Sequence, residues 1–160
     1  MKTLFSFLLF ELIAAKKCTL PSARFIKAGS KIFCAIYLAK YREQPEAVQA
    51  CKNLKAKLFL PKNDKENKAF LSAFPTLKYY YWLDITDPFP CLGKWEDSDG
   101  RNVTYFNWHK SQKHQNYVNQ YAYARGFNVG HVLEGEWTRV IPSERASAIC
   151  VQQVTGEAIA

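Results

Sequence analysis

The chain has 160 residues, long enough for one compact domain and too short for two ordinary ones. Hydrophobic residues make up 48% and charged residues 22%, which excludes an intrinsically disordered chain. The net charge of +8 favours acidic partners such as sulfated or uronic polysaccharides, anionic cell surfaces and acidic proteins, and it is equally compatible with a role in solubility alone.

The first fifteen residues have the pattern of a secretory signal peptide. A short positive start is followed by a mostly apolar stretch that Glu11 interrupts and that closes on two small residues at Ala15. The stretch is too short to span a bilayer as a helix. We therefore expect cleavage after Ala15 and export of residues 16–160 as one extracellular domain with a core at about 18–152. The alternative interpretation is a buried amphipathic helix at the N-terminus.

The first part of the domain predicts strands followed by a helix. Residues 24–38 alternate and are rich in β-branched and aromatic side chains, which indicates one or two short strands with a turn at Gly29. Residues 44–58 predict an amphipathic helix, because apolar residues recur at helical spacing. The residues of this stripe are Ala47, Cys51, Leu54 and Leu58.

A second helix, a strand and a long loop follow. Asn63 is a good N-cap for the helix, and Pro75 ends it. Residues 79–85 are typical of a strand, and residues 86–100 are dense in Pro, Gly and Asp, which indicates an irregular loop. Strand patterns return only at 137–141 and 146–151. This order predicts an α+β domain.

The four tryptophans stand in short motifs with a distinctive order. The motifs are Trp82-Leu83-Asp84-Ile85, Gly93-Lys94-Trp95, Tyr105-Phe106-Asn107-Trp108, and Gly135-Glu136-Trp137 followed by Ala148-Ile149-Cys150. Together with the first helix, this series resembles the core motifs of C-type lectin-like domains. The resemblance implies two helices with small antiparallel sheets and a long irregular loop, and it implies that the tryptophans are buried.

The five cysteines are expected to pair where geometry allows in an exported chain, and the odd number leaves one thiol over. The resemblance implies two bridges, Cys51–Cys150 and Cys18–Cys34, the second typical of the long form of the family. Cys91 is left unpaired or available for an interchain bridge, which would give a disulfide-linked dimer. Asn128 and Pro142 occupy the positions of the inner bridge that most members carry, so that bridge is absent.

The residues that hold a sugar-binding calcium ion in the family are replaced here. Calcium requires six to eight oxygen ligands, which sugar-binding members provide around a proline and from an Asn-Asp pair after a tryptophan. At the first position this chain has Gln112-Lys113-His114, and only the amide of Gln112 fits the pattern. At the second position Thr138-Arg139 follows Trp137. We therefore expect no calcium in the sugar site.

No other chemistry is indicated by the sequence. The spacings of His109, His114 and His131 match no common zinc pattern. No nucleophile motif is present, and no pair of carboxylates stands beside a histidine, so we expect neither an enzyme nor a bound cofactor. Nucleic acid is not an expected partner. Asn102-Val103-Thr104 is an acceptor motif for N-linked glycosylation.

Two functions remain open from the sequence. The first is recognition of a carbohydrate or glycosylated ligand without calcium, with acidic glycans among the candidates. The second is a protein–protein interaction module, such as a matrix, venom-like or receptor-ligand component. The candidate ligand-binding residues are Gln112, Lys113, His114, Tyr117, Tyr121, Arg125 and Arg139. Residues 117–125 are interpreted as part of the long loop, where tyrosine and arginine are favoured contact residues.

Overall fold

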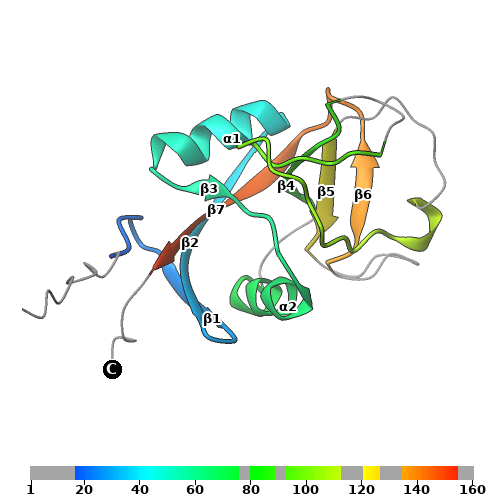
Figure 1. Cartoon of the computed structure of the whole chain (residues 1–160). Helices are drawn as coiled ribbons and strands as arrows, with labels where there is room; N and C mark the ends of the chain where they lie inside the picture. The colour runs from blue at the N-terminus through cyan, green and yellow to red at the C-terminus, as the bar shows by residue number, and fades with distance from the viewer. Residues whose placement is uncertain (1–16, 76–79, 89–92, 113–120, 127–134, 155–160) are drawn as a thin grey trace, which may run out of the picture.

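The computed structural model describes residues 17–75, 80–88, 93–112, 121–126 and 135–154. Two helices lie on opposite sides of a sheet, and the strands near the two ends of the domain lie side by side (Figure 1). None of the helices in these ranges is long and apolar enough to cross a lipid bilayer. The predicted signal peptide, residues 1–15, lies outside the described residues.

The N-terminal hairpin and the last strand form one half of the sheet. The antiparallel strands β1 (Arg24–Ala28) and β2 (Lys31–Arg42) flank a turn at Gly29, whose φ of 65° suits a residue without a side chain. β7 (Ala146–Val154) runs antiparallel to β2. The predicted strand region at 24–38 is therefore two strands, and the second extends to residue 42.

Helix α1 (Gln44–Asn53) is shorter than the predicted 44–58. Its N-cap, Glu43, forms a reciprocal capping box with Glu46. The helix ends in a Schellman motif, in which the N–H groups of Lys55 and Ala56 donate to Lys52 O and Cys51 O, both at 2.9 Å. The last predicted turn is wrong, because the chain leaves the helix here and forms β3 (Lys57–Leu58), which pairs with β7.

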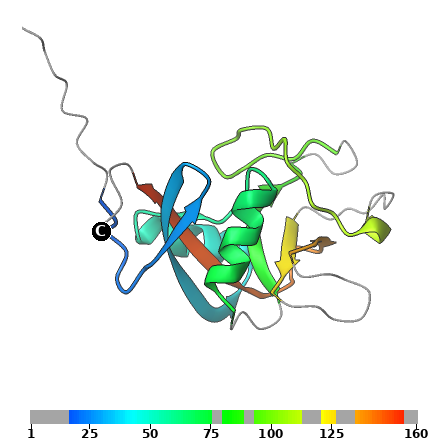
Figure 2. The same cartoon turned by 90° about the horizontal axis from the view of Figure 1, so that it is seen from below.

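Helix α2 (Asp64–Ala73) begins as the sequence predicts. The side chain of Asn63 accepts a hydrogen bond from the N–H of Glu66 at 2.9 Å. Figure 2, which shows the domain from below, places α2 in front of the sheet. Its buried residues include Glu66, Asn67 and Phe70, so the face that meets the sheet carries polar as well as aromatic side chains.

The other half of the sheet contains β4 (Tyr80–Thr86), β5 (Tyr121–Arg125) and β6 (Trp137–Val140). The strand order is β1-β2-β7-β4-β5-β6; every pair is antiparallel except β4 with β7, which is parallel. The interpretation of residues 121–125 as loop is wrong. This segment forms β5 between β4 and β6, with Ala122 and Ala124 fully buried.

Alternate residues of β4 and β7 face two separate cores. Leu83 and Ile149 face the first core, where they meet Phe70 of α2. Trp82 faces the second core, which contains Cys51 of α1. Because neighbouring residues of a strand point to opposite faces, the same two strands anchor both helices.

Both bridges that the resemblance implied are present. Cys51 of α1 bonds Cys150 of β7 across 99 residues, and Cys18 bonds Cys34 of β2 across 16 residues. Cys51, Cys34 and Cys150 are fully buried. The longer bridge links the first helix to the last strand, so it connects the N-terminal and C-terminal parts of the domain covalently.

Candidate functional site

The sequence candidates for ligand binding fall on three described elements. Gln112 ends the short 3-10 helix η1 (Lys110–Gln112). Tyr121 and Arg125 lie in β5, and Arg139 lies in β6. The other ligand-binding candidates lie outside the described residues, and these are Lys113, His114 and Tyr117. Cys91, the candidate for an interchain bridge, also lies outside them.

The structure separates two of these candidates onto opposite faces of the sheet. β5 and β6 pair with Tyr121 opposite Val140 and with Ala122 opposite Arg139. Since adjacent residues of a strand point in opposite directions, Tyr121 and Arg139 face different sides. The ring of Tyr121 packs edge-on against Trp82, with centroids 6.3 Å apart. Tyr121 therefore belongs to the packing around α1 and does not share a surface with Arg139.

Arg139 is held between two tryptophan rings. Its guanidinium carbon Cζ lies 5.1 Å from the ring centre of Trp108 and 5.4 Å from that of Trp95. Both distances are within the range of a cation–π interaction, in which the negative face of an indole attracts the positive group. The arginine is half-buried, so its charge is placed at one point by the two rings.

The rings around Arg139 form one aromatic cluster. Trp108 contacts both Trp95 and Trp137, with centroids 5.0 and 5.5 Å apart. Trp82, Trp95 and Trp137 are buried as the resemblance implied, whereas Trp108 is half-buried. Phe106 stacks on Trp108 and remains 38% exposed. Beside it is a shallow depression of about 550 Å³, lined by Gly93, Lys94, Trp95, Glu96, Asn102, Val103 and Phe106.

Backbone hydrogen bonds fix this cluster to the start of β6. The N–H of Trp137 donates to Asn107 O at 2.8 Å, and the N–H of His109 donates to Trp137 O at 3.0 Å. The side-chain amide of Asn107 donates to Gly135 O at 2.9 Å. Asn107 was missed as a site residue, although its place inside the Tyr105–Trp108 motif could have indicated it.

His109 has a local structural role. It is buried, and its Nδ1 lies 2.6 Å from the hydroxyl of Ser111 while its Nε2 lies 4.0 Å from a carboxylate oxygen of Glu136. His114 and His131 lie outside the described residues. Within the part of the chain that is described, no group of three or more His, Cys, Asp or Glu residues could hold a metal ion.

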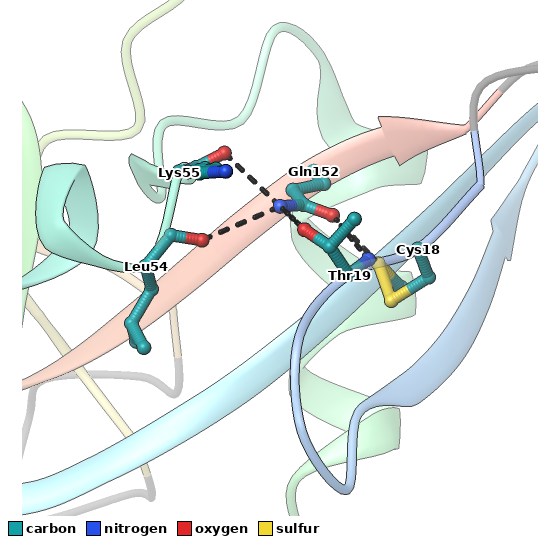
Figure 3. The surroundings of a disulfide bond; sticks show 6 residues. Cys18, Thr19, Leu54, Lys55 and Gln152 are labelled. Carbon is teal, nitrogen blue, oxygen red and sulfur yellow. Dashed lines mark hydrogen bonds between the residues drawn. A yellow bond between two sulfur atoms is a disulfide. The ribbon is translucent and has the colours of Figure 1, made fainter.

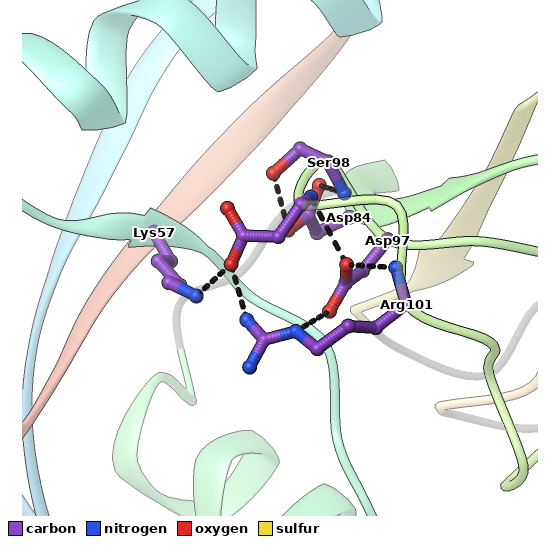
Figure 4. Close-up of polar contacts among 6 residues, drawn as sticks. Lys57, Asp84, Asp97, Ser98 and Arg101 are labelled. Carbon is purple, nitrogen blue, oxygen red and sulfur yellow. Dashed lines mark hydrogen bonds and ion pairs between the residues drawn. The ribbon is translucent and has the colours of Figure 1, made fainter.

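A second polar cluster connects β4 with the loop that follows it (Figure 4). The carboxylate of Asp84 accepts hydrogen bonds from the N–H and hydroxyl of Ser98 at 3.1 and 2.9 Å, and its burial raises its pKa above the ordinary value. Asp99 is exposed and contacts both Lys57 and Arg101. The hydrogen bond from Lys57 lowers the pKa of Asp99.

Substitution of these two aspartates by asparagine is expected to have opposite effects at pH 7. The fold favours the protonated form of Asp84, so Asp84→Asn should raise the free energy of unfolding, and this gain should shrink as the pH falls to about 4. The fold favours the ionised form of Asp99, so Asp99→Asn should lower stability at pH 7 and make little difference in acid. Urea unfolding at both pH values measures the difference. Equal signs for the two variants at pH 7 would contradict the assignment.

Comparison with known proteins identifies a family for most of the chain. The family model described as Lectin C-type domain matches residues 40–152. No curated protein matches the chain significantly. Among solved structures, the mouse scavenger receptor C-type lectin carbohydrate-recognition domain is similar at 17% identity, with a TM-score of 0.66 over 83% of this chain and 96% of that one.

Two further structures show how widely the fold is used. Human lithostathine has 17% identity and a TM-score of 0.67, covering 84% of this chain and 90% of its own. A calcium-independent type II antifreeze protein has 14% identity and a TM-score of 0.63, covering 82% of this chain and 97% of its own. At these identities the similarity establishes the fold and leaves the ligand to the residues of the site.

Proposed function

The chain belongs to the C-type lectin domain family, and from this premise we propose that it binds a glycan or a glycosylated ligand without a calcium ion in the sugar site. The proposal includes export of residues 16–160 to the extracellular space. The observation that carries it is the position of Arg139 between Trp95 and Trp108.

The charge of Arg139 opposes a calcium ion. By the resemblance, Thr138 and Arg139 replace the Asn-Asp pair whose oxygens hold the ion in sugar-binding members. A guanidinium group has only donors and no acceptor oxygen. A divalent cation about 6 Å from it would be repelled by about 5 kcal/mol at an effective dielectric constant of about 20. The residues present therefore do not fit calcium at this position.

The same residues suit direct contact with a sugar. The guanidinium group of Arg139 offers planar N–H donors to hydroxyl or carboxylate oxygens. Phe106 provides a partly exposed aromatic face beside the depression that Trp95 lines. An apolar sugar face on Phe106 and oxygens near Arg139 would use both groups without a metal.

We predict that glycan binding persists in EDTA and depends on Arg139. Binding to a glycan array should be unchanged by calcium, and Arg139→Gln should weaken it about tenfold, because one charge-assisted contact is worth about 1.5 kcal/mol or more. Arg145→Gln is the matched control, since Arg145 is an exposed arginine whose ion pair within the described residues is with Glu46. Calcium should leave the melting temperature of the chain unchanged.

Three outcomes would argue against this function. Binding that EDTA abolishes would mean that a metal is required. Equal loss of binding in the Arg139 and Arg145 variants would show that Arg139 does not form a specific binding site. An array that is blank at low salt, together with capture of a tight protein partner, would favour the protein–protein module instead.

A further inference from the structure

A groove rich in lysine lies between α2, β3 and the loop after β4. It has a volume of about 540 Å³, and its lining includes residues of β2, β3, β4, β7 and α2. Its cationic lining residues are Lys31, Lys55, Lys57, Lys62 and Arg101, and its acidic ones are Glu66, Asp84 and Asp97. Arg139, Trp108 and Phe106 do not line it, and it shares only Asn102 with the depression beside Phe106.

The acidic residues of the groove neutralise only some of these cations. Lys31 pairs with Glu66 at 2.9 Å, and Arg101 pairs with Asp97 at 3.3 Å. Lys55 and Lys62 are exposed, and neither forms an ion pair with any carboxylate of the described residues. The groove therefore presents two ammonium groups whose charge no carboxylate in the described part of the chain compensates.

Lys55 occupies a position where glycine is the usual residue. It follows the C-cap of α1 in the Schellman motif and has a φ of 55°, in the left-handed region that disfavours a side chain. The side-chain amide of Gln152 donates to Lys55 O at 3.0 Å and accepts from the N–H of Thr19 at 2.9 Å, beside the Cys18 bridge (Figure 3). This anchor holds the strained backbone, and the side chain of Lys55 lies on the groove.

Asp99 already shows how an exposed anion is held at the rim. Its carboxylate is contacted by Lys57 of β3 and by Arg101 of the loop after β4. Asp99 itself is 42% exposed at its side chain. Lys57 and Arg101 thus bind one solvent-exposed carboxylate at the edge of the groove that Lys55 and Lys62 line.

We propose that this groove binds a sulfated polysaccharide, with Lys55 and Lys62 contacting its sulfate groups and with Lys57 and Arg101 exchanging Asp99 for a further sulfate. Several cations along one groove match a linear chain with several anionic groups, and Asn102 and Gln153 on the lining can bond its hydroxyls. Single-stranded nucleic acid fits less well, because the phenylalanines of the lining are buried and offer no stacking face.

The test uses the full chain, produced without N-linked glycans so that Asn102 keeps its amide, with a size-defined sulfated heparin hexasaccharide as the probe in calorimetry. Replacing Lys55 and Lys62 together by glutamine should raise Kd about tenfold, and the affinity should fall steeply as salt rises. Replacing Lys40 and Lys68 together by glutamine is the matched control, because both are exposed, carry the same charge and lie outside the lining. This control should change Kd less than about twofold.

Two single substitutions test the proposal further. One is expected to strengthen binding of the hexasaccharide, and the other is expected to weaken binding while it raises the melting temperature. Asp99→Asn should lower Kd about threefold, since it releases Lys57 and Arg101 for the probe. Lys55→Gly should weaken binding yet raise the melting temperature by about 2 °C, because glycine relieves the left-handed backbone. A loss of binding through unfolding would lower the melting temperature instead.

The results separate this groove from the proposed function. Arg139→Gln should leave hexasaccharide binding unchanged, so either site can fail without the other. Equal weakening by the Lys40 and Lys68 control would show a diffuse charge effect and overturn the proposal. Equal affinity for the desulfated hexasaccharide, or for single-stranded DNA with the same dependence on Lys55, would overturn the assignment to sulfated sugars.

Discussion

Replacement of Cys51 and Cys150 by alanine is expected to lower the free energy of unfolding by about 5 kcal/mol. The bridge closes a loop of 99 residues, and in the chain-entropy model a loop of about that length restricts the unfolded chain by about 4.7 kcal/mol. Both cysteines are fully buried, so the loss of packing adds to this effect. Because small domains have only about 5–15 kcal/mol in total, the variant should be largely unfolded at 37 °C.

The second bridge provides the control. Cys18 and Cys34 close a loop of 16 residues, so their replacement by alanine should remove about 3 kcal/mol in the same model. Urea unfolding of both double variants, with the m-values compared, measures the difference. A larger loss for the Cys18 and Cys34 variant would show that loop length does not govern the stability of this domain.

Gly135→Ala is expected to lower the free energy of unfolding by about 3 kcal/mol through two effects. The residue has a φ of 81°, where a side chain is strained. A Cβ atom here would lie 2.7 Å from Cδ1 of Leu71 and 2.9 Å from Nδ2 of Asn67. Asn67 is buried in α2, so it cannot move aside freely.

Gly100→Ala separates these two effects. Gly100 has a similar φ of 76°, but a Cβ atom there would have no neighbour within 4 Å. This variant should lose about 1 kcal/mol from backbone strain alone, which leaves about 2 kcal/mol for the contact of Gly135 with α2. Thermal and urea unfolding of the two variants would give equal losses if the packing against α2 were unimportant.

Gly135 also connects stability with the candidate site. Its carbonyl oxygen accepts the side-chain amide of Asn107 at 2.9 Å, and Trp137 two residues later packs against Trp108. A shift of residue 135 away from α2 would therefore move the tryptophan rings that contact Arg139. Gly135 therefore contacts both α2 and the aromatic cluster, and its position fixes the distance between them.

Local signals in the sequence determined several parts of this structure. Asn63 predicted the start of α2 because an N-cap acts through a hydrogen bond only three residues away. The order of the tryptophan motifs indicated the fold, and the bridges it implied are present. These features could be predicted from the sequence because each depends on neighbouring residues or on motifs typical of a whole family.

The end of α1 and the presence of β5 were decided by tertiary structure. Lys55 terminates the helix without the glycine that normally marks a Schellman motif, because Gln152 from β7 holds its carbonyl. Residues 121–125 become a strand only because β4 and β6 provide hydrogen-bonding partners on both sides. Their short Tyr-Ala alternation indicated no strand by itself, since β-propensity depends on packing context.

The two proposed binding surfaces could not be located from the sequence. Tyr121 and Arg139 are both binding candidates from the sequence, yet the register of β5 and β6 puts them on opposite faces. The lysine groove joins Lys31, Lys55 and Lys62 with Arg101, residues far apart in the chain. Charge reveals only a total of +8, whereas a binding site requires those charges at one place, and only the folded chain brings them there.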